Sequence, residues 1–347
     1  MKPSTNSIFN ITGPSEFKQL ALEIFKYQSA ENEVYKQYIN TLNIDPATIT
    51  ELEQIPFLPI EFFKTHRIIT RPSSPAIRPD TFTSSGTTGT TQSKHYVNDV
   101  SVYETSYRKA FEYFYGNIEE YCILALLPSY LEREGSSLIY MADDLIERSK
   151  HPQSGFYLNN YEELIVLLSQ LKTQKTILLG VTYALLDLAE FHSPLERGLR
   201  PARMDESIRS GGGVLTDLII METGGMKGKR KEMVREELHA VLCKGFGVQL
   251  IHSEYGMTEL LSQAYSKGNG VFNGPPWMRV LIRDTNDPFT ILPFNKTGGI
   301  NVIDLANIDS CSFIATQDLG KLIDDNSFEV LGRFDNSDIR GCNLLVE

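Results

Sequence analysis

The sequence has little that would tie it to a membrane or to nucleic acid. Its longest apolar run, Cys122–Leu127, is far too short to cross a bilayer, and its first residues lack the apolar stretch of a signal peptide. Its 33 lysines and arginines against 44 acidic residues give a formal net charge of −11. That balance argues against a general nucleic-acid binder but leaves a local basic pocket open. We therefore expect a globular, cytoplasmic protein without a membrane span.

Cysteine is also scarce. The four cysteines lie far apart in the chain, so neither a CxxC redox motif nor a zinc knuckle is present. Without a signal peptide, the thiols are expected to be reduced. Cys122 falls in a strand-like run and Cys243 on the apolar side of a helix-like segment, and we expect both to be inert core residues.

The 347 residues suit one large domain or two of moderate size. The first eighty residues are predicted to be helical, with apolar residues at helical spacing after Pro14. From Tyr121 to Ile251, short apolar runs alternate with helix-like faces, which is typical of a mainly parallel sheet covered by helices. From Trp277 onward, short strands with turn residues indicate an antiparallel subdomain.

Local signals add three predictions within this outline. Gly245 is expected to end a helix, because glycine is common just after the last helical residue. Val248–Ile251 is expected to form a strand. Ile55–Phe63 contains two prolines and is expected to be extended.

The most informative segment is Thr83–His95, where two glycines stand among many serines and threonines. Glycines let the backbone turn its N–H groups toward an anion, hydroxyls add donors, and Lys94 can supply positive charge. The segment is not a Walker A loop, because the GxxxxGK[ST] spacing is missing. Composition alone leaves a solvated Ser/Thr loop as the alternative.

The order of residues in SSGTTG resembles the phosphate-binding loop of the adenylate-forming superfamily, which includes acyl-CoA synthetases, luciferases and peptide-synthetase adenylation domains. Four further segments resemble motifs of that superfamily in the same order: Ser210–Gly213, Tyr255–Glu259 (YGMTE), Thr316–Gly320 (TQDLG) and Gly332–Asn336 (GRFDN). The resemblance spans roughly residues 83–341. It implies an α/β fold of mixed, mainly parallel sheets flanked by helices, plus a small antiparallel subdomain. It also implies an acyl-adenylating core over 1–331, with a hinge remnant and tail over 332–347.

Two further segments narrow the resemblance. Ile55–Lys64 (IPFLPIEFFK) and Leu127–Arg133 (LPSYLER) are similar to segments of the LuxE-type acyl-protein synthetases. This implies that ATP and Mg²⁺ activate a fatty or other carboxylic acid, which is then carried on a cysteine of the enzyme. It also implies a possible partner that resembles an acyl-CoA reductase.

The same resemblance assigns roles to residues. It implies that Glu259 ligates Mg²⁺, Thr258 touches the α-phosphate, Asp318 binds the ribose and Tyr255 stacks on the adenine. The residues that it assigns to the nucleotide are Ser84, Ser85, Gly86, Thr87, Thr88, Gly89, Gly211, Gly212, Gly213, Tyr255, Gly256, Asp318 and Arg333. Each also has a plain structural alternative: a helix-start acid for Glu259, a turn for the glycines and a core position for Tyr255. His95 and His252 could polarise a carboxylate or phosphate, or could be structural.

The sequence departs from the superfamily pattern in three places. Gln92 stands where the loop usually has a lysine, so that Lys94 is the nearest one, and Gln317 replaces a glycine. The sequence ends at Glu347, just past the hinge motif, so we expect most of the C-terminal domain and its catalytic lysine to be missing.

That ending gives Cys342 its predicted role. LuxE-type enzymes carry their acyl group on a cysteine near the C-terminus, and Cys342 lies six residues after Asn336. The thiolate is the reacting form, and Arg340 would help to form it. The alternatives are that Cys342 is buried in a terminal strand, or that Cys311 is the nucleophile.

Three functions follow from these patterns and stay open. The first is an ATP-dependent acyl-protein ligase of the LuxE type. The second is an acyl- or aryl-adenylating ligase that delivers to coenzyme A or a carrier protein. The third is a non-catalytic subunit that binds nucleotide or an acyl chain within a reductase complex.

Overall fold

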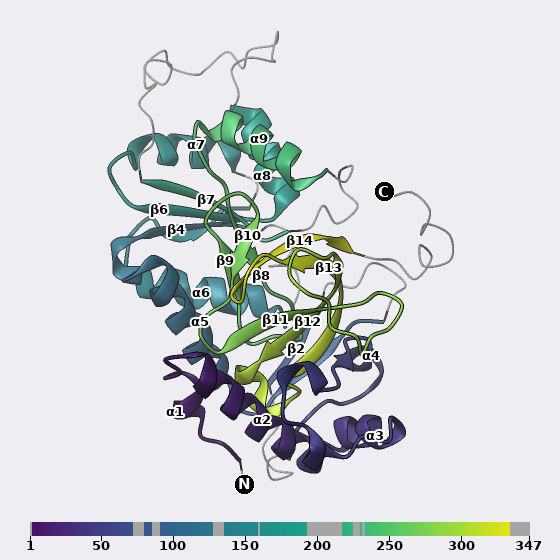
Figure 1. The fold of residues 1–347 in the computed structure, drawn as a ribbon. Helices are drawn as coiled ribbons and strands as arrows, with labels where there is room; N and C mark the ends of the chain where they lie inside the picture. Colours follow the sequence, from purple (N-terminus) through teal and green to yellow (C-terminus); the bar gives the residue numbers. More distant parts are fainter. Residues whose placement is uncertain are drawn as a thin grey trace.

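The computed structural model describes residues 2–71, 80–84, 91–127, 135–158, 160–192, 217–224, 230 and 233–333. The strands of these residues form one mixed sheet of twelve strands and a separate two-stranded hairpin (Figure 1). This arrangement confirms the predicted α/β class. No helix of the described residues is both long and apolar enough to cross a membrane.

One half of the large sheet is parallel. Its strands, in spatial order, are β5 (Gly155–Phe156), β4 (Cys122–Leu126), β6 (Thr176–Gly180), β7 (Leu218–Glu222) and β8 (His252–Tyr255). Every residue of β4 and β6 is buried, which explains their continuous apolar sequences. The helices of this half are α5 (Val100–Tyr115), α6 (Ser137–Ser149), α7 (Tyr161–Gln170), α8 (Thr182–His192) and α9 (Arg235–Phe246).

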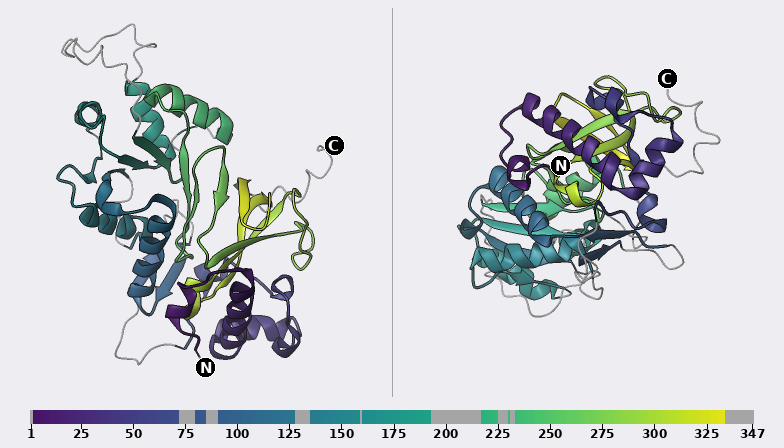
Figure 2. Two further views of the ribbon diagram at one scale, coloured as in Figure 1. Left: turned by 60° about the vertical axis from the view of Figure 1, so that its left-hand side comes forward. Right: turned by 90° about the horizontal axis from the view of Figure 1, so that it is seen from below.

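The other half is antiparallel, as predicted from Trp277 onward, although its first two strands precede that residue. Its strands, in spatial order, are β9 (Ala264–Ser266), β10 (Val271–Asn273), β14 (Ser327–Arg333), β13 (Phe313–Leu322), β12 (Gly298–Asp304) and β11 (Met278–Arg283). It is continuous with the parallel half, because β8 pairs in parallel with β7 and antiparallel with β9. In Figure 2 the green strands lie between the teal helices and the yellow strands.

The N-terminal helices lie beside the antiparallel half, at the opposite end of the molecule from α8 and α9 (Figure 1). They are α1 (Thr5–Ile8), α2 (Pro14–Glu31) and α3 (Glu33–Thr41), followed by 3₁₀ turns at Pro46–Thr48 and Leu52–Gln54. The start of α2 at Pro14 is as predicted. Its buried Gln28 donates to the backbone oxygens of Asn307 and Ile308, which fixes α2 against the turn after β12.

Only part of Ile55–Phe63 is extended. Leu58–Pro59 forms β1, which pairs in parallel with β13, and the backbone N–H of Ile60 donates to Ala315. The helix α4 (Phe62–Thr65) begins immediately after, so the predicted extended segment is too long. This pairing brings the N-terminal region to the strand that carries the TQDLG motif.

Two local predictions are wrong for physical reasons. The helix α9 continues through Gly245 and ends at Phe246, and Gly247, with φ +68°, is the residue that leaves it. Gly245 instead allows close packing, because a Cβ there would lie 2.6 Å from the Cβ of Ala189 on α8. The next strand is His252–Tyr255 rather than Val248–Ile251, because the N–H groups of Gly247 and Val248 still bond back to the helix at Cys243.

Candidate active site

The two ends of the serine- and threonine-rich loop are joined to each other. The strands β2 (Asp80–Thr83) and β3 (Lys94–Val97) form the hairpin from which the loop extends. The N–H of Ser84 donates to the carbonyl of Ser93 (3.1 Å), and the N–H of Ser93 donates to Ser84 Oγ (2.9 Å). The loop residues Ser85, Gly86, Thr87, Thr88 and Gly89 lie outside the described residues, so their predicted phosphate contacts stay predictions.

The YGMTE segment follows β8 and is held by buried polar contacts. Nδ1 of His95 lies 2.8 Å from the carbonyl oxygen of Thr258, and Nδ2 of Asn307 donates to the carbonyl of Glu259 (2.8 Å). Asp304 accepts hydrogen bonds from the backbone N–H groups of Leu261 and Ser262, which lie two and three residues after Glu259. These contacts fix the backbone that carries Thr258 and Glu259.

Glu259 is a buried carboxyl group, 5 % exposed. Burial raises its pKa, and the nearby groups Ser93, Arg333 and Lys64 act in the opposite direction. Among the described residues, no group of three or more histidines, cysteines or carboxylates could hold a metal alone. A single carboxylate beside phosphate oxygens is, however, an arrangement that Mg²⁺ accepts.

Tyr255, Asp318 and Arg333 form a chain of contacts between β8, β13 and β14. The hydroxyl of Tyr255 donates to Oδ2 of Asp318 (2.8 Å), and Nε of Arg333 donates to Oδ1 (3.3 Å). Burial raises the pKa of Asp318, and Arg333 offsets part of that rise. The ring of Tyr255 packs edge-on against Phe272 and Phe328, so a stacking role toward adenine stays a prediction.

These segments surround one cavity of about 360 Å³. Of the residues predicted from the sequence, Ser84, Gly256, Thr258, Glu259 and Arg333 line it. They come from the loop base, the YGMTE segment and the end of β14, which are far apart in the chain. The structure therefore brings these five predicted residues together, whereas Tyr255 and Asp318 are not among the described residues that line the cavity.

Among the described residues, the lysine that lines this cavity is Lys64, for which the sequence predicted no role. It lies on α4, next to the β1–β13 pairing, and Gln317 donates to Glu61 beside it (2.5 Å). Lys94, the predicted cation, is exposed on β3 and is not among the described residues that line the cavity. The only signal for Lys64 in the sequence is its place at the end of IPFLPIEFFK.

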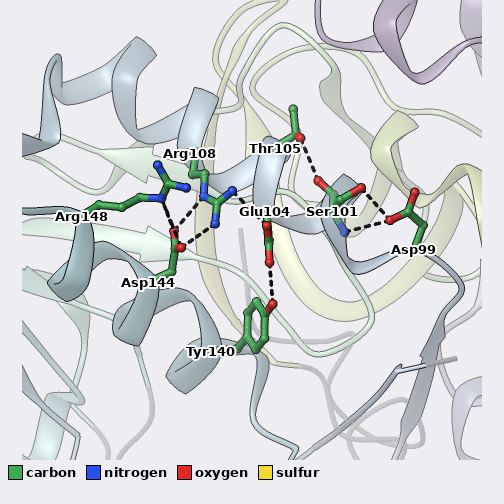
Figure 3. A network of polar contacts seen from close by, with 8 residues as sticks. All are labelled: Asp99, Ser101, Glu104, Thr105, Arg108, Tyr140, Asp144 and Arg148. Carbon is green, nitrogen blue, oxygen red and sulfur yellow. Dashed lines mark hydrogen bonds and ion pairs between the residues drawn. The ribbon is translucent and has the colours of Figure 1, made fainter.

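Another part of the lining is the N-terminal end of α6, which contributes Ser137, Leu138 and Met141. A polar network ties this helix to α5 (Figure 3). Arg108 on α5 pairs with Asp144 (2.5 Å), and the hydroxyl of Tyr140 donates to Glu104 (2.6 Å). The network thus positions one wall of the cavity.

Neither predicted histidine lines the cavity. His95 is fully buried, and burial lowers its pKa to about 4, with the Thr258 carbonyl acting the other way. Its Nε2 has no hydrogen-bond partner among the described residues. His252 lies beside the hydroxyl of Tyr115 (3.2 Å), and burial lowers its pKa to about 4 as well. The structure thus favours the structural alternative for both, as neutral imidazoles.

The described cysteines are poorly suited to be nucleophiles. Burial raises the pKa of Cys122 to about 11 and that of Cys311 to about 12. Cys122 is in the core as predicted, whereas Cys243 is only half-buried. Cys342 and the glycines Gly211, Gly212 and Gly213 lie outside the described residues.

Comparison with solved structures identifies the fold. 2-Hydroxyisobutyryl-CoA ligase, in an open conformation with 2-HIB-AMP and CoA, superposes with a TM-score of 0.64 at 12% identity, covering 93% of this chain and 70% of that one. The same ligase in the postadenylation state gives 0.63 at 11% identity, covering 93% and 68%. ATP-bound MatB from Rhodopseudomonas palustris gives 0.50 at 16% identity, covering 73% and 47%. No protein-family model and no curated protein sequence matches the chain. The chain therefore has the fold of the adenylate-forming ligases, as its motifs predict.

Proposed function

We propose that this protein uses ATP to convert a carboxylic acid to acyl-AMP and then transfers the acyl group to a thiol. The observation that carries the proposal is the cavity itself. Ser84, Thr258, Glu259 and Arg333, which three separate motifs of the adenylate-forming superfamily contain, line one space in a fold shared with an adenylating ligase.

The first step needs two anions held together. A carboxylate oxygen attacks the α-phosphorus of ATP, and the bond to pyrophosphate breaks. Lys64 and Arg333 supply positive charge at the cavity, and Ser84 and Ser93 supply hydroxyl groups there. Such preorganised donors and cations lower the barrier to phosphoryl transfer. In this proposal residues 85–89 and Gly211–Gly213 complete the nucleotide site. Asp318 accepts hydrogen bonds from the hydroxyl groups of the ribose.

Glu259 would hold Mg²⁺ together with the phosphate oxygens of ATP. The ion would neutralise charge on the triphosphate when bound. The carboxyl group is suited to this because it is buried beside Lys64 and Arg333, whose charges favour its ionised form against the effect of burial. The side-chain amide of Asn307 donates to the backbone carbonyl of Glu259 and so fixes the backbone that carries this carboxyl group.

The second step follows from the LuxE-type resemblance. The Cys342 thiolate attacks the acyl carbon, AMP leaves, and a thioester forms. The buried thiols of Cys122 and Cys311, with their raised pKa values, are poor alternatives. A fatty acid and a reductase-like partner that receives the acyl group complete this form of the proposal. Delivery to coenzyme A, which the similar ligase binds, is the second candidate.

Carboxylate-dependent exchange of labelled pyrophosphate into ATP tests the first step. We expect exchange with the wild type and its loss, by about a hundredfold or more, in Glu259→Gln, because the variant removes the charge that would hold the metal. The buried position accepts the isosteric amide, so circular dichroism should be unchanged. Wild-type exchange in Glu259→Gln would remove Glu259 from the metal site.

Intact-protein mass after incubation with ATP, Mg²⁺ and a mixture of acids tests the second step. A mass increase equal to an acyl group indicates an acyl-enzyme. Acyl-CoA formation without any acyl-enzyme would favour the ligase that delivers to coenzyme A. Nucleotide binding without pyrophosphate exchange for any acid would favour the non-catalytic subunit.

A further inference from the structure

One side of the cavity carries a buried carboxyl group that the nucleotide chemistry does not need. Glu254, on β8, lines the cavity and is 8 % exposed. Among the described residues, burial and the carboxylate of Glu222 act on its ionisation, and no donor or cation offsets them. Burial raises the pKa of Glu254 to about 8, and the neighbouring carboxylate of Glu222 adds to the rise.

Two further polar side chains that line the cavity each have a buried atom without a hydrogen-bond partner among the described residues. Gln263 is 4 % exposed and lines the cavity, and its Oε1 has no hydrogen-bond partner among the described residues. The same holds for Oγ1 of Thr223, at the end of β7. Buried polar atoms are nearly always paired, so these two unpaired atoms, on the same cavity as the Glu254 carboxyl group, point to a missing ligand.

The chain makes room for this arrangement. A Cβ on Gly256 would lie 2.3 Å from Oε1 of Glu254 and 3.3 Å from Cγ of Gln263. A side chain at position 256 would therefore displace the carboxyl group of Glu254 from its place in the cavity. Glu222 does not serve as their partner, because Arg235 and the N–H of Gly224 already donate to it (3.1 and 2.7 Å).

We infer that the carboxylic acid activated here carries a protonated amino group, which Glu254, Gln263 and Thr223 bind. The inference rests on the proposed function for its substrate, an acid to be adenylated. The substrate would then be an amino-substituted acid and not the unsubstituted fatty acid that the LuxE-type resemblance implies.

The chemistry of the three groups selects this ligand. A carboxylate, an amide oxygen and a hydroxyl are acceptors, and an ammonium offers three N–H donors. Among the described residues, Glu222 is the charged group that acts on Glu254, so an ammonium would compensate the charge of ionised Glu254. The methyl end of an alkyl chain would bury all three groups without partners, which is unfavourable.

Ligand-detected NMR on the full chain tests the inference with matched acids. The pairs are 4-aminobutanoate and butanoate, 6-aminohexanoate and hexanoate, and leucine and 4-methylpentanoate. In the wild type we expect at least one amino acid to bind about tenfold or more tightly than its deaminated partner, the usual size of a charge-assisted contact. Glu254→Gln and Gln263→Leu should each reduce that preference. Glu237→Gln, which changes an exposed carboxyl group on α9, should leave it intact.

The outcomes separate this inference from the proposed function. Tighter binding of the deaminated acids, an unchanged preference in both variants, or no binding of any amino acid would overturn the inference. Pyrophosphate exchange is measured on the same panel. An amino-acid preference that depends on Glu254 but is accompanied by no exchange would support the inference and refute the adenylation proposal.

Discussion

Glu254 and Glu259 stand five residues apart, and both are buried, yet their surroundings differ. Glu259 lies near Lys64 and Arg333, whose positive charges favour its ionised form. Glu254 has the carboxylate of Glu222 nearby, which disfavours ionisation further. The surroundings of Glu259 suit a carboxylate that binds a cation next to an anionic substrate. The surroundings of Glu254 keep its carboxyl group protonated until a positively charged group binds beside it.

The pKa of Glu254 makes stability depend on pH. Because its folded-state pKa is about 8 against an ordinary value of 4.5, the folded chain retains a proton that the unfolded chain loses above pH 4.5. The free energy of unfolding should therefore fall as pH rises from about 5 to 8. Glu254→Gln cannot ionise. We expect it to match the wild type at pH 5 and to exceed it at pH 8.5 by on the order of a few kcal/mol.

Urea unfolding at pH 5, 7 and 8.5 measures this difference. Glu237→Gln serves as the control, because its exposed carboxyl group should leave the wild-type slope in place. Parallel curves for Glu254→Gln and the wild type over the whole range would mean that Glu254 ionises normally in the folded chain.

Two lysines near the candidate site differ in their position. Lys64 lines the cavity and acts on Glu259, whereas Lys94 is exposed beside the loop. We expect Lys64→Ala to lower pyrophosphate exchange by roughly 10- to 100-fold, through loss of charge at the phosphates, and Lys94→Ala to change it little. Initial rates at saturating ATP make the comparison. The reverse order would restore Lys94 as the phosphate-binding lysine that the sequence indicates.

At the scale of elements, the contact between α8 and α9 depends on one glycine. A Cβ on Gly245 would lie 2.6 Å from the Cβ of Ala189 and 3.2 Å from its Cα, so the two helices would have to move apart. We expect Gly245→Ala to lower the free energy of unfolding by about 1–3 kcal/mol despite the better helix propensity of alanine. Gly155→Ala, where a Cβ would meet nothing within 4 Å, should be nearly neutral. Thermal unfolding of both variants tests this, and equal melting temperatures would contradict it.

The elements that the sequence predicted best are those with a strong apolar period. The strand β4 lies at the strand-like apolar run Cys122–Leu127, because burial on both faces leaves a continuous apolar sequence. The helix α5 was not predicted, and β8 was placed four residues too early. In β8 polar residues such as Ser253 and Glu254 occupy buried positions, so its sequence does not look like a strand.

The sequence predicted the site residues that lie inside the motifs and missed those that lie outside them. Ser84, Thr258 and Glu259 were named from local sequence, and they meet at the cavity. Lys64 reaches it through the pairing of β1 with β13, which joins residues more than 250 positions apart. Gln263 reaches it across a turn beyond the motif. Long-range contacts of this kind leave no local pattern in one sequence.

At the scale of the whole molecule, the cavity lies where the sheet changes character. The strand β8 is the boundary, with parallel β7 on one side and antiparallel β9 on the other. The parallel half contributes Thr223 and Glu254, and the antiparallel half contributes Gln317 and Arg333. A ligand in this cavity therefore touches both halves. Binding should stabilise them together, as any ligand specific to the folded state does.

The last prediction separates the two proposed steps on the intact chain. Adenylation would use the cavity, whereas transfer would use Cys342 beyond the described residues. We therefore expect Cys342→Ser to exchange pyrophosphate at close to the wild-type rate and yet to form no stable acyl-enzyme, because a serine hydroxyl is a much weaker nucleophile at neutral pH. Cys243→Ser changes the half-buried thiol and should retain the acyl-enzyme. Intact-protein mass before and after hydroxylamine treatment gives the result. A hydroxylamine-sensitive adduct on Cys342→Ser would place the nucleophile at another cysteine, and loss of exchange in that variant would place Cys342 in the adenylation step itself.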